Sequence, residues 1–215
     1  MIELAVLSGK GGTGKTSVVA SFAALSESKV LADCDVDASD LHLVLGPRTI
    51  RTEAFSGSKL ARIDPGLCSL CARCARVCRY GAVLESDSGF CIDESACEGC
   101  GACLIVCPAG AVELVDAPTG EWYVSESRLG PLVHARLGIG QEASGKLVTI
   151  VRSQAAALAK KRGLGLSIID GSPGIGCPVI ASMTGATLAL VVTEPTMSGL
   201  HDLKRVAAVA DRLSV

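Results

Sequence analysis

The sequence predicts an α/β fold in which helices flank a mostly parallel sheet, with a small cysteine-rich unit inserted into it. Short apolar runs alternate with helix-length segments, and the first run leads into a glycine-rich turn. Nine of the eleven cysteines fall between about residues 63 and 116, which predicts the insertion. We therefore expect an α/β domain in two parts, 1–61 and 118–215, around an inserted unit at 62–117.

The elements of the α/β domain follow in chain order. The sequence predicts strands at residues 2–7, 29–32, 166–169 and 187–192, and helices at 15–25, 144–161 and 198–213. The helix at 144–161 is amphipathic, because its apolar residues recur on one face: Leu147, Ile150, Val151, Ala155 and Leu158. Strands that alternate with helices imply parallel pairing through right-handed crossovers.

Composition excludes several classes of protein. Of 215 residues 49% are hydrophobic, so the chain can bury a core and is not disordered. A net charge of −2 and 3% aromatic residues argue against a nucleic-acid partner. The longest uncharged stretch, 171–193, is broken by glycine and proline, which argues against membrane insertion. Without a secretory signal we expect a cytoplasmic location, where cysteines serve as metal ligands more often than as disulfides.

A phosphate-binding loop is predicted at the first glycine-rich turn. Its residues fit G-x-x-x-x-G-K-[ST] at every position: Gly9, Lys10, Gly11, Gly12, Thr13, Gly14, Lys15 and Thr16. Glycines let backbone N–H groups converge on phosphate oxygens, and the N-terminus of the following helix adds a favourable dipole. Lys15 is expected to reach the β- and γ-phosphates of a nucleotide, and Thr16 to ligate Mg²⁺.

Two runs of cysteines repeat after 29 residues and have the C-x₂-C-x₂-C-x₃-C spacing of bacterial two-cluster ferredoxins. In that pattern three thiolates of one run and the fourth of the other hold each 4Fe–4S cluster. The expected ligand sets are Cys68, Cys71, Cys74 and Cys107 for one cluster, and Cys97, Cys100, Cys103 and Cys78 for the other. Proline follows the second run at Pro108, whereas Arg79 takes that place after the first.

Zinc is the alternative ligand for C-x₂-C pairs, but it gives no reason for the further cysteines in both runs. Three cysteines stand outside the runs. Cys91 is expected to pack inside the inserted unit, while Cys34 and Cys177 lie in segments expected to flank the γ-phosphate. Two interpretations of Cys34 and Cys177 remain open. Cys177 could serve as a ligand or redox group shared across a dimer axis, or both cysteines could simply pack in the core.

The loop Lys10-Gly11-Gly12-Thr13-Gly14-Lys15-Thr16 resembles the deviant Walker A motif of the MinD/ParA class of P-loop ATPases. Together with the cysteines, the chain is similar to members of that superfamily with an inserted two-cluster ferredoxin domain. The resemblance implies a P-loop NTPase fold carrying a small α+β ferredoxin-like domain. It also implies a homodimer that sandwiches ATP, with Lys10 reaching the partner's nucleotide. Family members usually continue beyond a closing helix, so we expect the second part to be truncated at its C-terminus.

The same resemblance implies roles for residues outside the loop. Asp35, in Asp33-Cys34-Asp35, matches the aspartate that positions the attacking water or the metal, and Asp33 is expected to cap the strand end. Asp170 matches the Walker B aspartate, followed by the switch glycine Gly174. Thr16, Asp35 and Asp170 would hold Mg²⁺. Glu194 and Pro195 resemble the loop that frames the adenine base.

We expect an ATPase with three alternatives for its role. The first couples ATP hydrolysis to low-potential electron transfer through two 4Fe–4S clusters to a redox partner protein. The second is an iron–sulfur assembly or carrier ATPase that hands a cluster to an apo-protein target. The third is a redox-sensing nucleotide switch.

Overall fold

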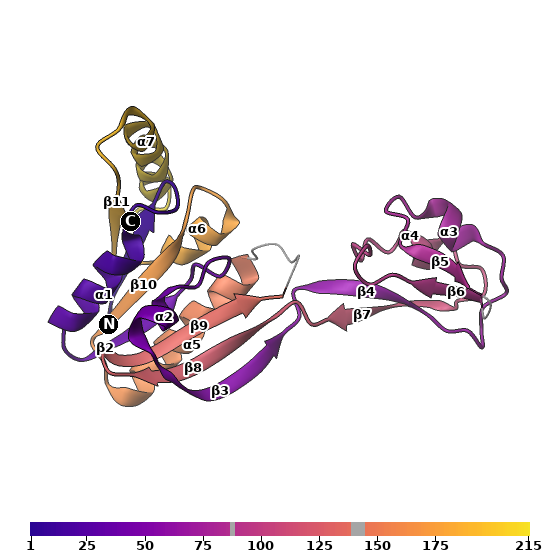
Figure 1. Ribbon diagram of the computed structural model, residues 1–215, viewed down its shortest axis with the longest axis horizontal. Helices are drawn as coiled ribbons and strands as arrows, with labels where there is room; N and C mark the ends of the chain where they lie inside the picture. The colour runs from indigo at the N-terminus through magenta and orange to yellow at the C-terminus, as the bar shows by residue number, and fades with distance from the viewer. Residues whose placement is uncertain (87–88, 139–144) are drawn as a thin grey trace. The chain divides into compact units, whose positions relative to one another are not determined.

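The computed structural model describes residues 1–86, 89–138 and 145–215, which form two compact units (Figure 1). The first unit consists of Met1–Phe55 and Gly120–Val215, and the second, Ser56–Thr119, is inserted between them. The insertion starts before the expected residue 62 because a strand that begins at Ser58 pairs with the strand that leaves the unit.

The first unit is built on a seven-stranded sheet in the order β11-β1-β10-β2-β9-β8-β3. Its strands are β1 (Ile2–Ser8), β2 (Lys29–Asp33), β3 (Arg48–Phe55), β8 (Gly120–Ser127), β9 (Gly130–Leu137), β10 (Leu166–Pro173) and β11 (Leu188–Val192). The strands from β11 to β9 pair in parallel, which confirms the mostly parallel sheet. The strands β8 and β3 add an antiparallel edge that the sequence did not predict.

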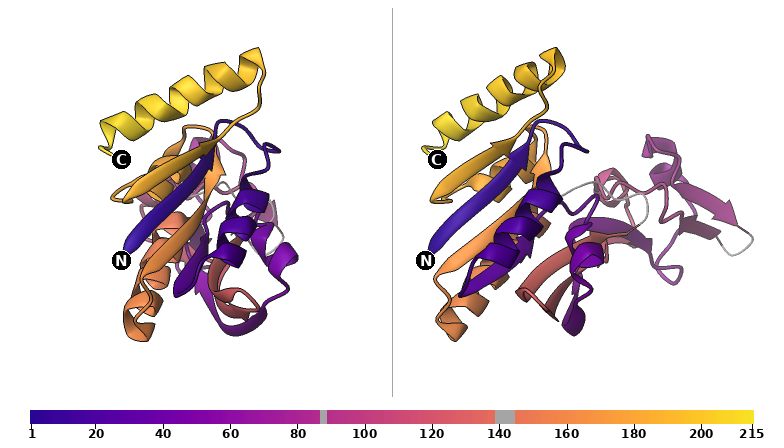
Figure 2. Two further views of the ribbon diagram at one scale, coloured as in Figure 1. Left: turned by 90° about the vertical axis from the view of Figure 1, so that its left-hand side faces the viewer. Right: turned by 60° about the vertical axis from the view of Figure 1, so that its left-hand side comes forward.

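Helices cover both faces of this sheet, and Figure 2 shows α1 and α5 on opposite sides of it. The helices are α1 (Lys15–Leu25), α2 (Leu41–Leu45), α5 (Gly145–Arg162), α6 (Cys177–Met183) and α7 (Met197–Arg212). Ser144, the first residue of the helix expected at 144–161, lies outside the described residues. None of the helices in the described part of the chain is long and apolar enough to cross a bilayer.

The strands divide their side chains between two hydrophobic cores, because successive residues of a strand point to opposite faces. Ala5 and Leu7 of β1 pack in the core beneath α5, α6 and α7. Val6, between them, packs in the core beneath α1 and α2. On α5 the buried positions include Val148 and Ala159, whereas the expected Ile150 and Leu158 are only partly buried.

The second unit is small and internally repeated. Its elements are β4 (Ser58–Ile63), α3 (Arg73–Val77), β5 (Val83–Ser86), β6 (Gly89–Ile92), α4 (Ala102–Ile105) and β7 (Val112–Ala117). The strands pair antiparallel as β4–β7 and β5–β6. Positive φ angles recur at equivalent positions of the two copies, at Leu70, Ala72 and Gly81 and again at Gly99, Gly101 and Gly110. The sequence repeat is therefore also a repeat of backbone conformation.

Candidate functional site

The glycine-rich loop joins the end of β1 to the start of α1. Gly12 and Gly14 have φ angles of 80° and 90°, a left-handed conformation that favours glycine. Gly14 is the N-cap of α1. Among the described residues, no side chain forms a capping hydrogen bond at this helix N-terminus, and no acidic residue occupies the first turn. The helix N-terminus therefore presents its backbone N–H groups and dipole without a competing carboxylate, as an anion site requires.

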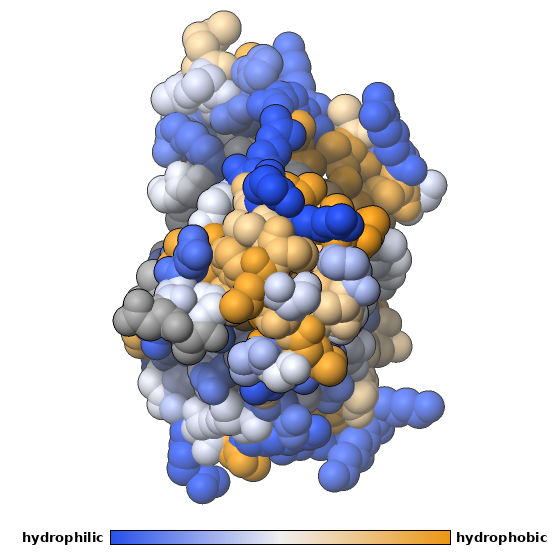
Figure 3. All heavy atoms as spheres, turned by 90° about the vertical axis from the view of Figure 1, so that its right-hand side faces the viewer, coloured by the Kyte–Doolittle hydropathy of each residue, from blue (hydrophilic) through white to orange (hydrophobic). Residues whose placement is uncertain are grey.

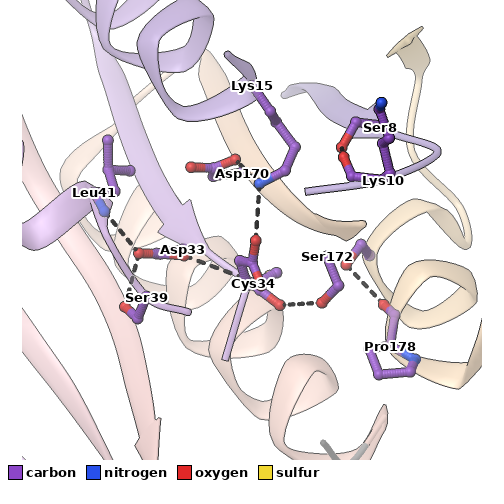
Figure 4. A network of polar contacts seen from close by, with 12 residues as sticks. Ser8, Lys10, Lys15, Asp33, Cys34, Ser39, Leu41, Asp170, Ser172 and Pro178 are labelled. Carbon is purple, nitrogen blue, oxygen red and sulfur yellow. Dashed lines mark hydrogen bonds and ion pairs between the residues drawn. The ribbon is translucent and has the colours of Figure 1, made fainter. Parts of the chain in front are cut away.

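Lys15 lies at the centre of a buried charged cluster. Its Nζ atom is 2.6 Å from Asp170 Oδ1 and 3.1 Å from Asp35 Oδ2, and its side chain is only 6% exposed (Figure 4). Burial lowers the pKa of Lys15, but the charges and hydrogen bonds of the two carboxylates outweigh it and raise that pKa overall. Burial raises the pKa of Asp35 against the lowering effect of Lys15. The three side chains form one electrostatic unit.

Parallel strand pairing explains why this cluster forms. Asp170 on β10 lies beside Val6 of β1 on one side and beside Asp33 of β2 on the other. The loop that follows β1 and the segment that follows β2 therefore meet at the same edge of the sheet. Asp35 comes just after the end of β2 and reaches Lys15 there.

The cluster has oxygen atoms that lack a partner in the described part of the chain. Asp170 Oδ2 and Thr13 Oγ1 are both buried, and neither atom has a hydrogen-bond partner among the described residues. Carboxylate and hydroxyl oxygens are the ligands that Mg²⁺ prefers. Asp170 and Asp35, together with the half-buried Thr16 that follows Lys15 in the sequence, supply the kinds of oxygen atom that a magnesium ion would need.

Asp33 organises the segment after β2. It is fully buried and accepts hydrogen bonds from the Asp35 and Leu41 amides and from the Ser39 hydroxyl (Figure 4). Burial and the nearby Asp170 raise the pKa of Asp33 to about 8. Its bond to the amide of Asp35 makes Asp33 a positioning residue for that carboxylate, a contribution that the sequence did not reveal beyond a strand cap.

The segment after β10 is tied to both neighbouring loops. The Ser172 hydroxyl donates to the carbonyl of Cys34 at 2.7 Å, and the Gly174 amide donates to the carbonyl of Ser8 at 2.8 Å. Gly174 has a φ of 92°, which favours glycine. Ser172 was missed by sequence reasoning, although its position between Asp170 and Gly174 is a signal that could have identified it. A displacement at Gly174 would act directly on the phosphate loop.

Lys10 does not join the buried cluster. Its Nζ atom forms an ion pair with Glu194 Oε2 at 2.8 Å, and the two side chains are 41% and 36% exposed. Glu194 and the exposed Pro195 belong to the loop between β11 and α7, where the Thr196 hydroxyl caps α7 by accepting from the Gly199 amide. A Cβ at Gly9 would lie 2.3 Å from Asp202 Cβ, so glycine allows α7 to approach the phosphate loop.

The eight repeated cysteines surround two separate pockets of the second unit. Cys68, Cys71, Cys74 and Cys107 line one pocket. Cys78, Cys97, Cys100 and Cys103 line the other. Each pocket thus takes three cysteines from one run and the fourth from the other run. Within the described ranges, no three His, Cys, Asp or Glu side chains are close enough together to hold a single metal ion.

Equivalent cysteines of the two copies have equivalent surroundings. The amides of Ala82 and Ala111 donate to the sulfurs of Cys78 and Cys107, each at 3.3 Å. Cys74 and Cys103 are both buried in the small core of the unit. A Cβ at Gly99 would lie 2.0 Å from the carbonyl oxygen of Lys59, so the second run requires glycine at that position. Hydrogen bonds from backbone amides to cysteine sulfur are a common feature of metal sites with thiolate ligands.

The three other cysteines are not grouped. Cys91 was expected to pack inside the unit, but it is exposed on β6, because that two-stranded sheet leaves this side chain uncovered. Cys34 is fully buried, and burial raises the pKa of its thiol. Cys177 is exposed at the first residue of α6.

Comparison with known proteins gives consistent results. The family model described as the CobQ/CobB/MinD/ParA nucleotide binding domain matches residues 4–214. The uncharacterized protein MJ0578 of Methanocaldococcus jannaschii is 36% identical over 209 residues, which cover 95% of this chain and 72% of that protein. MJ0579 of the same organism is 28% identical over 222 residues, which cover 100% of this chain and 77% of that protein.

Two solved structures share the fold. The septum site-determining protein MinD complexed with Mg-ADP from Pyrococcus horikoshii OT3 has a TM-score of 0.51 at 16% identity, with 98% of this chain covered. The MinC:MinD cell division protein complex of Aquifex aeolicus has a TM-score of 0.51 at 14% identity, with 100% covered. The chain spans 65% of the length of each of those structures.

Proposed function

The chain belongs to the CobQ/CobB/MinD/ParA nucleotide-binding domain family, and from this premise we propose that it is an ATPase that couples nucleotide hydrolysis to electron transfer through two 4Fe–4S clusters. Members of the MinD/ParA group are ATPases, so ATP binding follows from the family. The coupling to iron–sulfur chemistry goes beyond the family and rests on the second unit.

The nucleotide half of the proposal is supported by the buried contact of Lys15 with Asp35 and Asp170. Lys15 would leave these carboxylates for the β- and γ-phosphates, and its charge would stabilise the negative charge that develops there. The two carboxylates and Thr16 would then be free to hold Mg²⁺, which neutralises phosphate charge. Asp33 would keep Asp35 in place through the amide hydrogen bond.

The cluster half is carried by one observation, the division of eight cysteines into two pockets of four. Each pocket has the three-plus-one composition that the two-cluster ferredoxin spacing requires. A structural zinc site would also use four thiolates, but it gives no reason for the fourth cysteine of each pocket to come from the other run. Thiolate ligands need a reducing compartment, so the proposal includes a cytoplasmic location.

We also propose a homodimer that encloses ATP between its subunits. Lys10 lies at the surface of the phosphate loop, and its ion pair with Glu194 is exposed and therefore weak. It could leave Glu194 at little cost and reach the nucleotide of a partner subunit.

A second function, delivery of a cluster to an apo-protein, is favoured by the exposure of Cys71 and Cys100. These are equivalent residues of the two runs, and both leave one side of their pocket accessible. A redox-sensing nucleotide switch would use the same parts with slow hydrolysis.

Anaerobic purification followed by measurement of iron, sulfide and zinc tests the cluster proposal. Two clusters require about eight iron and eight sulfide per chain. EPR spectra of the reduced protein, recorded with and without MgATP, then test coupling. Zinc in place of iron would refute the cluster proposal, and spectra and potentials that MgATP leaves unchanged would refute coupling. Transfer of iron to an apo-ferredoxin during ATP turnover would favour the carrier function instead.

A further inference from the structure

An open groove lies between α3 and α4 on the surface of the second unit. Arg73, Arg76 and Val77 line it from α3, and Ile105 and Cys107 line it from the other side. Ile105 is 84% exposed, which is unusual for so large an apolar side chain on a small unit. Figure 3 shows a face of the molecule on which strongly hydrophilic and hydrophobic side chains lie side by side. The groove is thus lined by two arginines, by Cys107 and by the apolar side chains of Val77, Ile105, Val106 and Pro108.

The two copies of the repeat differ at positions in and next to this groove; Arg73, Arg76, Ile105 and Pro108 line it. They agree at every cysteine of the runs, but three arginines of the first copy are replaced by apolar residues in the second. The equivalent pairs are Arg73 and Ala102, Arg76 and Ile105, and Arg79 and Pro108. Cluster ligation does not explain this difference, because the cysteines are the same in both copies. The difference concerns the surface.

The arginines give this surface a positive charge in an acidic chain. Residues 65–84 contain three arginines and no acidic residue, whereas the whole chain has a net charge of −2. Arg73, Arg76 and Arg79 are all exposed, and none of them forms an ion pair with a carboxylate of the described residues. Arg76 is anchored by its bond to the carbonyl of Cys71 at 3.4 Å. Exposed charges of one sign without partners steer a partner of the opposite sign.

We infer that the groove between α3 and α4 docks an acidic electron-carrier protein that presents an apolar contact ringed by carboxylates. The inference deepens the proposed function, because Cys107 belongs both to the groove and to the cysteine set of one pocket. A carrier seated there would lie next to that set. A nucleic acid fits less well, because no aromatic side chain lines the groove for stacking.

Binding can be measured without electron transfer. We would titrate the anaerobically purified, full-length protein into fluorescently labelled, oxidised flavodoxin of net negative charge, at low and high salt. Cytochrome c, a basic electron carrier, serves as the counterpart of opposite charge. The test variant is Arg76→Glu. The matched control is Arg128→Glu, which makes the same charge change at an exposed position of the first unit.

We expect flavodoxin to bind at low salt and to be released by salt, with cytochrome c not bound at this surface. Arg76→Glu should weaken flavodoxin binding about tenfold or more, because it reverses a charge at the interface, and Arg128→Glu should weaken it less than about twofold. Ile105→Ser should weaken the binding seen at low salt without changing how steeply salt reduces it, because it removes apolar contact and no charge. This third variant leaves the charges unchanged.

Equal effects of Arg76→Glu and Arg128→Glu would overturn the inference, as would flavodoxin that does not bind. Arg76-dependent binding of a single-stranded oligonucleotide in place of flavodoxin would overturn it too. Measuring iron in the same protein distinguishes failure of the docking site from failure of the proposed cluster function. Protein with both clusters but no Arg76-dependent binding would refute the docking site alone, whereas charge-dependent binding by iron-free protein would refute the cluster function alone.

Discussion

Replacing Glu194 with Gln is expected to strengthen nucleotide-dependent dimerisation, because it releases Lys10. The pair joins Lys10 Nζ to Glu194 Oε2 at 2.8 Å, with both side chains more than one-third exposed. Ion pairs of this kind contribute about 0.2–1 kcal/mol. A dimer in which each Lys10 reaches across would break two such pairs, at a cost of about 0.4–2 kcal/mol. Removing that cost would tighten the dimer by a factor of about 2–30.

Sedimentation velocity with a non-hydrolysable ATP analogue and Mg²⁺ measures this effect. The difference between the variant and the wild type should shrink at high salt, because salt screens exposed charges. Glu53→Gln is the matched control, since it breaks a similarly exposed ion pair with Arg51 on β3. The reasoning is refuted if Glu194→Gln leaves dimerisation unchanged at low salt. A loss of nucleotide affinity would instead assign Glu194 to the base pocket.

Three further predictions concern other parts of the molecule. Lys15→Ala should reduce ATP hydrolysis by a factor of about 100 or more in a phosphate-release assay, because a charge on the β- and γ-phosphates is lost; unchanged turnover would contradict the loop assignment. Cys74→Ser should remove one cluster and about half of the iron, whereas Cys91→Ser, outside both pockets, should retain all of it; equal iron in the two variants would contradict the ligand sets. Burial and the neighbouring His42 lower the pKa of His134 from 6.5 to about 4, so the folded state resists protonation and stability should fall as pH drops from about 6.5 to 4. His134→Gln should remove roughly 1–3 kcal/mol of this pH dependence in urea titrations, and a variant with the same pH profile as the wild type would disprove the prediction.

The parallel part of the sheet was predictable because its strands are short apolar runs buried on both faces. The predicted strand at 29–32 corresponds to β2, and the predicted helix at 15–25 corresponds to α1. The resemblance assigned Asp35 and Asp170 to the nucleotide site, and the structure brings both carboxylates to Lys15. The ends of neighbouring parallel strands meet at one edge of a sheet, so polar residues placed after such strands come together.

The antiparallel edge was not predictable from hydrophobic pattern. Arg48–Phe55 is exposed along nearly its whole length, with Phe55 as its buried residue, so β3 shows no apolar alternation. Pairing with β8 and the stacking of Arg51 over Trp122 define this strand instead. Such contacts between distant segments leave no local signal in the sequence.

The Lys10–Glu194 pair was likewise hidden, because it depends on tertiary structure. Glu194 follows β11, which pairs in parallel with β1, and Lys10 follows β1. That pairing brings the loop after β1 next to the loop after β11. The resemblance gave no sign of the contact, because it assigned Lys10 to the partner's nucleotide and Glu194 to the adenine base. The grouping of the cysteines shows the opposite case, because three cysteines of one run and the fourth of the other line each pocket, as their spacing predicted.

Three neighbouring strands of the sheet, β2, β9 and β8, connect the segment around Asp33 to the residue that follows the inserted unit. Asp33 ends β2, which pairs with β9 through Leu31 and Leu132. Leu132 also pairs with Ser125 of β8, and β8 begins at Gly120, the residue that follows the insertion. A Cβ at Gly120 would lie 2.6 Å from the carbonyl oxygen of Arg136, so β8 and β9 are closely held at this point. If nucleotide binding shifts the segment after β2, the proposed coupling would have to pass through these strand pairs, and a measured effect of MgATP on the cysteine unit is what would establish it.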